Sequence, residues 1–150
     1  MATLLVIERT AQGRAYLGGL VRDCGHHVLE AGDAEKGLEL ARRVRPDLVL
    51  ANAFLGPMDG YDLVRRLRAH NTTECIPVVL FTSARDEWLA RAIARASDVE
   101  CVIERPGDRD CVVAAITSAL EGDGSGETSP GTEYERERQR KSPARRAAGG

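Results

Sequence analysis

The sequence is poor in several features that mark common classes of protein. Aromatic residues make up 4% of its 150 residues, and no apolar run approaches the roughly 18 residues that a membrane-spanning helix needs. Its 21 basic and 23 acidic residues leave a net charge of −2, so charge alone gives no drive toward nucleic acid or an anionic membrane. The opening "MATLLVIERT" has neither a basic leader nor a cleavage site of small residues. These absences predict a cytoplasmic protein with no membrane insertion and no nucleic-acid partner.

The cysteines show no pairing pattern. The four cysteines are Cys24, Cys75, Cys101 and Cys111, and no two of them are spaced as Cys-x-x-Cys. Cys101 lies inside an apolar run, where free cysteine packs as a small hydrophobic residue. The stretch "CGHH" at 24–27 offers three imaginable metal ligands, but its place at the end of a helical pattern favours turn residues. We therefore expect neither disulfides nor a zinc site.

Four compact apolar runs and a weaker one at 27–31 predict buried β-strands. They are rich in Val, Leu and Ile without clean alternation, as strands covered on both faces are, and they span 3–7, 27–31, 47–52, 77–82 and 100–103. Segments with helical spacing follow each run, at 11–24, 34–45, 60–70, 84–97 and 111–122. Alternation of this kind predicts an α/β fold, a doubly wound five-stranded parallel sheet between two layers of helices.

Local signals set the expected helix ends. In the first helix we expect a buried face formed by Ala15, Leu17, Leu20 and Val21, and a stop at Gly25. Asp33 and Asp59 precede later helices as N-caps, and either Asp108 or Asp110 opens the last helix.

The chain divides into two parts by composition. Residues 1–121 carry the strand and helix patterns, whereas 122–150 hold Gly, Ser, Pro and charge without apolar periodicity. Such a segment cannot bury enough apolar surface to offset its ordering entropy, so we expect a disordered charged tail. It serves either as an inert solubilising extension or as a docking tether.

Polar residues gather where the predicted strands end, which in parallel sheets is the edge that forms the functional crevice. They are Glu8, Arg9, Asn52, Thr82, Ser83, Glu104, Arg105 and Pro106. With "RPDLVLANAFLGPMDGYDLVRRLR" and "IPVVLFTSA", this order resembles the receiver domain of two-component response regulators over residues 3–121. The resemblance implies a flavodoxin-like three-layer fold and a bacterial signalling or phosphorelay role.

The resemblance also implies a phosphorylation site from which this chain departs. An intact receiver has two acids after the first strand that hold Mg²⁺, and an aspartate after the third strand that accepts phosphate. Here the acid pair becomes Glu8 and Arg9, and the acceptor position is Asn52. The family's hydroxyl and proline are kept as Thr82 and Pro106, but its lysine becomes Arg105 and its switching aromatic residue becomes Val102.

These departures should weaken both phosphorylation and Mg²⁺ binding. An acyl phosphate forms on a carboxylate oxygen, so an amide at the acceptor position predicts that direct phosphorylation fails. Mg²⁺ prefers anionic oxygen ligands, and one carboxylate beside two guanidinium groups predicts weak or absent Mg²⁺ binding. We expect the guanidinium of Arg9 or Arg105 to pair with Glu8 or Glu104 instead. Without an aromatic rotor at Val102 or a phosphate to attract Thr82, the family's two-state coupling lacks its parts.

Three interpretations therefore remain open. The first is a degenerate pseudo-receiver that works as a phosphorylation-independent protein-interaction module, with no enzymatic activity and no cofactor. The second keeps phosphorylation at a non-standard carboxylate such as Asp59. The third is a pocket for a small anion or a nucleotide-like ligand, with Arg9, Arg105 and Thr82 as donors. No Ser-His-Asp or Cys-His pairing is legible in the crevice, which argues against a hydrolase.

A partner surface is predicted from the resemblance at about residues 84–120. Trp88, the single tryptophan, begins the expected fourth helix there, with Arg91 and Arg95 at helical spacing. Exposed Trp and Arg are common at binding hot spots, although Trp88 could equally pack as core. The expected partners are proteins of a signalling pathway, and a homodimer through this face is a second expectation.

Overall fold

The computed structural model describes residues 1–82, 92, 99, 101–103 and 107–121. The predicted tail and most of the predicted fourth helix lie outside this part of the chain. So do seven residues singled out from the sequence, namely Ser83, Trp88, Arg91, Arg95, Glu104, Arg105 and Pro106.

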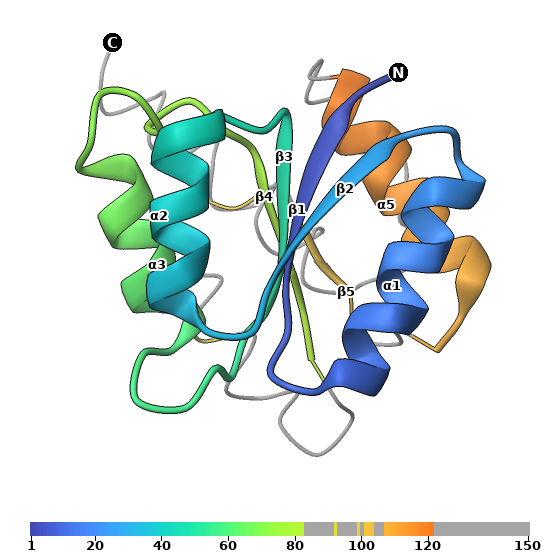
Figure 1. Ribbon diagram of the computed structural model, residues 1–150, viewed down its shortest axis with the longest axis horizontal. Helices are drawn as coiled ribbons and strands as arrows, with labels where there is room; N and C mark the ends of the chain where they lie inside the picture. The colour runs from blue at the N-terminus through green and yellow to red at the C-terminus, as the bar shows by residue number, and fades with distance from the viewer. Residues whose placement is uncertain (83–91, 93–98, 100, 104–106, 122–150) are drawn as a thin grey trace, which may run out of the picture.

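A parallel sheet forms the centre of the molecule (Figure 1). Its strands are β1 (Thr3–Ile7), β2 (His27–Ala31), β3 (Leu48–Asn52), β4 (Val78–Phe81) and β5 (Cys101–Ile103). They lie in the order β2-β1-β3-β4-β5, with every neighbouring pair parallel. Each predicted strand is confirmed to within one residue at either end.

Helices cover both faces of the sheet. The described helices are α1 (Ala11–Asp23), α2 (Ala34–Val44), α3 (Gly60–Arg68) and α5 (Arg109–Glu121). Figure 1 shows α2 and α3 on one face and α1 and α5 on the other. The doubly wound three-layer architecture expected from the sequence is therefore confirmed.

The residues that begin and end the helices are largely those expected from the sequence. The carboxylates of Asp33 and Asp59 accept the backbone N–H of the residue three positions on, which makes them the N-caps of α2 and α3. At α5 the choice falls on Asp108, whose Oδ1 accepts the backbone N–H groups of Asp110 (3.1 Å) and Cys111 (3.4 Å). Gly25 follows α1 with a φ of 87°, in the left-handed region that favours glycine.

The face predicted for α1 is wrong in one position. Leu17, Leu20 and Val21 are buried as expected, but Ala15 is exposed and Gly18 is buried with the leucines. Successive helical residues turn by about 100°, so Ala15 and Leu17 lie about 200° apart around the axis. The buried stripe is therefore centred on Leu17, Gly18 and Val21.

Two apolar layers hold the sheet to its helices. The first lies under α2 and α3 and includes Leu5, Val49, Leu63 and Leu80 among its buried residues. The second lies under α1 and α5 and is built from the strand residues that point the other way, such as Leu4 and Leu50. Because both faces are covered, the central strands are fully buried and fix the sheet edge at which the polar residues sit.

None of the helices in the described part of the chain is long and apolar enough to cross a membrane.

Candidate functional site

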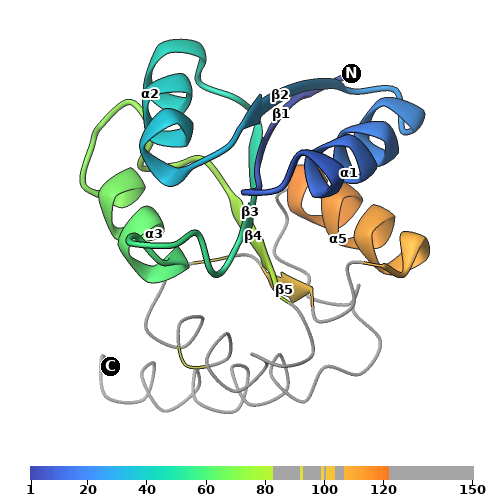
Figure 2. The ribbon, with the colours of Figure 1, turned by 60° about the horizontal axis from the view of Figure 1, so that its bottom comes forward.

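The candidate site lies at the carboxyl edge of the sheet, which Figure 2 turns toward the viewer. Glu8 follows β1 directly, Asn52 is the last residue of β3 and Thr82 follows β4. β1, β3 and β4 are adjacent, so the sheet brings these residues to one edge, as predicted. Arg105 and Pro106, which follow β5, lie outside the described residues.

Glu8 is a buried carboxylate held by N–H donors. Its side chain is 8% exposed, and its Oε1 accepts the backbone N–H of Arg9 at 2.6 Å and that of Thr10 at 3.4 Å. The Nδ2 of Asn52 lies 3.4 Å from Oε1 and 3.2 Å from Oε2. Charge-assisted hydrogen bonds from several donors stabilise a carboxylate that burial alone would penalise.

Asn52 uses both ends of its amide. Its Nδ2 donates to Glu8, and its Oδ1 accepts the backbone N–H of Phe54 at 2.9 Å. Each function of an amide matches one need here: a donor for the buried carboxylate and an acceptor for the loop after β3. A carboxylate at the same position offers no donor to Glu8.

The expected ion pair between Arg9 and Glu8 is not what forms. The side chain of Arg9 is exposed and has no ion pair within the described parts of the chain, and Arg9 instead gives Glu8 its backbone N–H. The reason is local, because a carboxylate at the start of the loop can reach the N–H groups of the next two residues at no entropic cost to a long side chain. The alternative partners, Glu104 and Arg105, lie outside the described residues.

Thr82 and Val102 are both buried. Thr82 is 0% exposed, and its backbone N–H donates to the carbonyl of Ile103 at 3.1 Å. Val102, at the position of the family's switching aromatic residue, is 6% exposed and belongs to the core layer under α2 and α3. Val102 therefore acts as a core residue of β5 rather than a side chain at the surface.

Two residues that organise the site were missed in the sequence. The Nη1 of Arg14, on α1, donates to the carbonyls of Glu8 (2.7 Å) and Arg9 (3.0 Å), and so ties the loop after β1 to the helix. A Cβ on Gly13 would come within 2.8 Å of Glu8 Cγ, so only glycine leaves room for the carboxylate. A lone arginine or glycine in a helix carries no sequence signal for such a role.

Asp59 lies near the site but is committed to another task. Its Oδ1 accepts the backbone N–H of Asp62 at 2.9 Å as the cap of α3. The loop from Asn52 to α3 is further closed by a short antiparallel bridge between Phe54 and Asp59. The sequence-based choice of Asp59 as an N-cap is confirmed.

The described part of the site holds one carboxylate, one amide and one hydroxyl. No group of three or more His, Cys, Asp or Glu side chains that could hold a metal ion occurs among the described residues. The histidines lie elsewhere: His26 accepts the backbone N–H of Ala2 near the amino end of β1, and His70 follows α3. Neither His26 nor His70 lies at the carboxyl edge of the sheet, and the groups described there favour binding over covalent chemistry.

Comparison with known proteins places the chain in a family. The model of the response regulator receiver domain matches residues 4–117. The chain belongs to this family. Receiver domains act in signalling pathways with protein partners, so the protein is a signalling component.

Individual relatives agree with this assignment. Protein PilH of Pseudomonas aeruginosa is 25% identical over 81% of this chain and 100% of its own length. The transcriptional regulatory protein AfsQ1 of Streptomyces coelicolor is 36% identical over 58% of this chain, which spans only 37% of that protein. A solved receiver domain of the sensor histidine kinase PA1611 of P. aeruginosa, with a magnesium ion in its active-site cleft, matches with a TM-score of 0.73. That match is 20% identical, covers 80% of this chain and 98% of the other, and shows the shared fold.

Proposed function

We propose that this receiver domain signals through protein contacts without being phosphorylated. The observation that carries the proposal is the amide of Asn52, which ends β3 and hydrogen-bonds both oxygens of Glu8. Asn52 stands where the family resemblance implies the acceptor aspartate.

An amide at this position supports a chemically silent pocket. Acyl phosphate formation needs an anionic carboxylate oxygen as nucleophile, and a neutral amide supplies none. The amide is also fully engaged, with Nδ2 on Glu8 and Oδ1 on the N–H of Phe54. Attack by Asn52 would require breaking both contacts as well as a nucleophile that the residue lacks.

The same contacts argue for weak Mg²⁺ binding. A cation at Glu8 competes with the N–H donors of Arg9, Thr10 and Asn52 for the lone pairs of one carboxylate. Mg²⁺ gives up its hydration water reluctantly and prefers several anionic ligands. The receiver domain of PA1611 has a magnesium ion coordinated in its active-site cleft. In this chain the Glu8 carboxylate already accepts N–H groups from Arg9, Thr10 and Asn52.

The two alternative functions have less support. The Oδ1 of Asp59 caps α3, and phosphorylation on Oδ2 would turn this charged acceptor into the weaker carbonyl oxygen of an acyl phosphate, which disfavours that route. Anion binding needs donors that face the crevice, yet the hydroxyl-bearing Thr82 is 0% exposed. The exposed Arg9 is the one described donor that remains for an anion among those named from the sequence.

The partner surface belongs to the proposal as well. We place it on the face formed by residues 84–120, of which α5 is described, and expect signalling proteins or a second copy of the chain to bind there. Trp88→Ala and Arg91→Ala should then weaken partner capture, while Asn52→Asp leaves it unchanged because no phosphate is involved. Loss of capture on Asn52→Asp, with no phosphoryl donor present, would argue that the pocket itself sets the binding state.

The deciding experiment is an intact-mass assay after incubation with a small acyl-phosphate donor and Mg²⁺. We expect wild-type protein to gain no phosphoryl mass. Asn52→Asp is run beside it, and the double variant Arg9→Asp with Asn52→Asp restores the acid pair as well as the acceptor. Uptake by the double variant shows that the fold and the donor are competent.

A matched variant separates the alternatives. Asp59→Asn keeps a side-chain oxygen that caps α3 but removes the carboxylate. If wild type gains phosphoryl mass and Asp59→Asn does not, the acceptor is Asp59 and the proposed function is wrong.

A further inference from the structure

A groove between α2 and α3 lies outside the receiver site, and its three arginines and two glutamates give it a net charge of +1. It encloses about 370 Å³ and is lined by Glu35, Leu38, Glu39, Arg42, Arg43 and Arg66. α2 and α3 run side by side on one face of the sheet (Figure 1), and none of the groove residues belongs to the Glu8 and Asn52 site. We call this the arginine groove.

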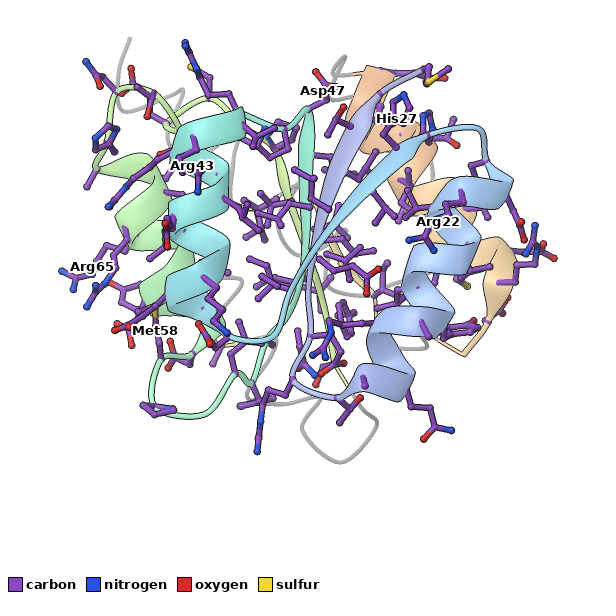
Figure 3. All side chains as sticks on the ribbon, in the orientation of Figure 1. Arg22, His27, Arg43, Asp47, Met58 and Arg65 are labelled. Atoms are coloured by element: carbon purple, nitrogen blue, oxygen red, sulfur yellow. The ribbon has the colours of Figure 1, made fainter. Side chains whose placement is uncertain are left out.

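The guanidinium groups of the arginine groove are mostly unpaired. Arg43 is 3.7 Å from Glu39, whereas Arg42 and Arg66 have neither an ion pair nor a hydrogen bond among the described residues. Arg65 lies on the same pair of helices, and Figure 3 shows its side chain pointing away from the sheet. Basic residues in the last turn compensate a helix dipole, and α2 and α3 together carry five arginines there, of which Arg68 donates to the carbonyls of Glu74 and Ile76.

The groove also has an apolar floor. Leu38, on α2, is the one apolar residue among those that line the groove, and it is 4% exposed. Guanidinium groups around an apolar floor favour a peptide with carboxylates and some apolar contact over a small free ion, because planar guanidinium groups bind carboxylates with two hydrogen bonds.

The chain itself contains a segment of the matching charge. Residues 123–137 hold five acidic residues and one arginine, and five basic residues without an acid follow in 138–150. This acidic segment lies outside the described residues. It follows α5, which ends at Glu121 on the opposite face of the sheet.

The linker is long enough for the acidic segment to reach the groove. The strands are parallel, so α2, α3 and α5 all end at the amino edge of the sheet, and a chain leaving Glu121 can pass over that edge. The 16 residues from Gly122 to Glu137 span up to about 50 Å when extended, against a radius of gyration of about 14 Å for a domain of this size. A tethered segment has an effective concentration on the order of millimolar, so weak ion pairs suffice for binding.

We propose that residues 123–137 bind the arginine groove of their own chain through ion pairs with Arg42 and Arg66. The test uses the ¹⁵N-labelled full chain and the triple variant Glu133→Gln, Glu135→Gln, Glu137→Gln. The backbone amide signals of Leu38, Arg42 and Arg66 should differ between the two proteins at about 0.01 M salt. The difference should vanish at about 1 M salt, where the Debye length has fallen from about 30 Å to about 3 Å.

A second variant, with a control, tests the groove side of the proposed contact. Arg42→Glu with Arg66→Glu should move the amide signals of residues 133–137 to their high-salt positions. Lys36→Glu reverses one charge on α2 outside the groove, half the change of the double variant, and should leave these signals in place. The proposal is wrong if the amide signals of residues 133–137 are the same in the double variant and in wild type. It is also wrong if the groove signals change on dilution, because a second copy of the chain would then supply the segment. None of these signals depends on Asn52, so the result stands apart from the phosphorylation assay.

Discussion

At the scale of single residues, the contact between Glu8 and Asn52 decides what the site can do. The Nδ2 of Asn52 lies within 3.4 Å of both carboxylate oxygens, in a position where the carboxylate is 8% exposed. The two residues are 44 positions apart in the chain, and only the pairing of β1 with β3 brings them together. The pair supplies one negative charge and its own donors, which is a satisfied network rather than an open ligand set.

Replacing Asn52 by aspartate should destabilise the protein. The substitution removes the donor to Glu8 and sets two carboxylates against each other, which we expect to lower the free energy of unfolding by roughly 1–3 kcal/mol. Mg²⁺ should reduce this loss in the free energy of unfolding, because a cation relieves the repulsion between the two carboxylates of the variant. Urea denaturation with and without Mg²⁺ measures both effects.

Asn71→Asp is the matched control for that experiment. It makes the same chemical change at an exposed position, where we expect less than about 0.5 kcal/mol and no response to Mg²⁺. An Asn52→Asp variant as stable as this control would show that the amide contact contributes nothing.

Asn52 should also resist conversion to aspartate during ageing. Deamidation requires the backbone nitrogen of the next residue to attack the side-chain amide. The N–H of Ala53 is donated to the carbonyl of Phe81 at 2.8 Å inside the sheet. Peptide mapping after incubation at mildly alkaline pH should find the exposed Asn71 deamidated before Asn52. The reverse order would mean that the loop after β3 opens readily.

At the scale of elements, the helices are held to the sheet by close approach as well as by apolar burial. Gly37 of α2 lies directly over Ile7 at the end of β1, and a Cβ at that position would overlap Ile7 Cδ1. Ile7 is 0% exposed, so its side chain has little room to move aside. Contact with α2 thus positions the end of β1, which directly precedes Glu8.

Gly37→Ala should lower the free energy of unfolding by roughly 1–3 kcal/mol, because it overpacks the contact between α2 and β1. Gly19→Ala, in α1, is the control. No atom lies within 4 Å of its Cβ position, so the gain in helix propensity should stabilise the protein by about 0.5–1 kcal/mol. Urea denaturation midpoints compare the two. Equal shifts in the same direction would contradict this account of the packing.

At the scale of the whole molecule, the chain divides by composition near residue 121, because 122–150 hold no apolar periodicity. The two apolar layers run from Leu4 to Ala119, and the family match covers residues 4–117. We therefore propose a boundary between a folded receiver part at 1–121 and a charged tail at 122–150.

A chain that ends at Glu121 should unfold in one cooperative transition. Its free energy of unfolding should lie within about 0.5 kcal/mol of the longer chain's at about 1 M salt, where tail contacts are screened. Urea denaturation of both proteins at high salt tests this. A large loss of stability on truncation would place part of the core in residues 122–150.

The sequence by itself determined the five strands and the described helices of this protein, and their order along the chain. Strands at 3–7, 27–31, 47–52, 77–82 and 100–103 were readable because a sheet covered on both faces needs uninterrupted apolar runs, and the caps at Asp33 and Asp59 were readable because capping is a contact over three residues. These are local rules. The resemblance to receiver domains then indicated which of the residues at the strand ends form the site.

Only the tertiary structure decided how the site residues partner one another. The sequence suggested an arginine beside Glu8, but the carboxylate takes the backbone N–H of Arg9 and the side chain of Asn52. Arg14 and Gly13 act through the loop after β1, and nothing in their spacing signalled it. Hydrogen-bond partners depend on distances of a few tenths of an ångström between distant segments, and strand pairing and helix packing set those distances.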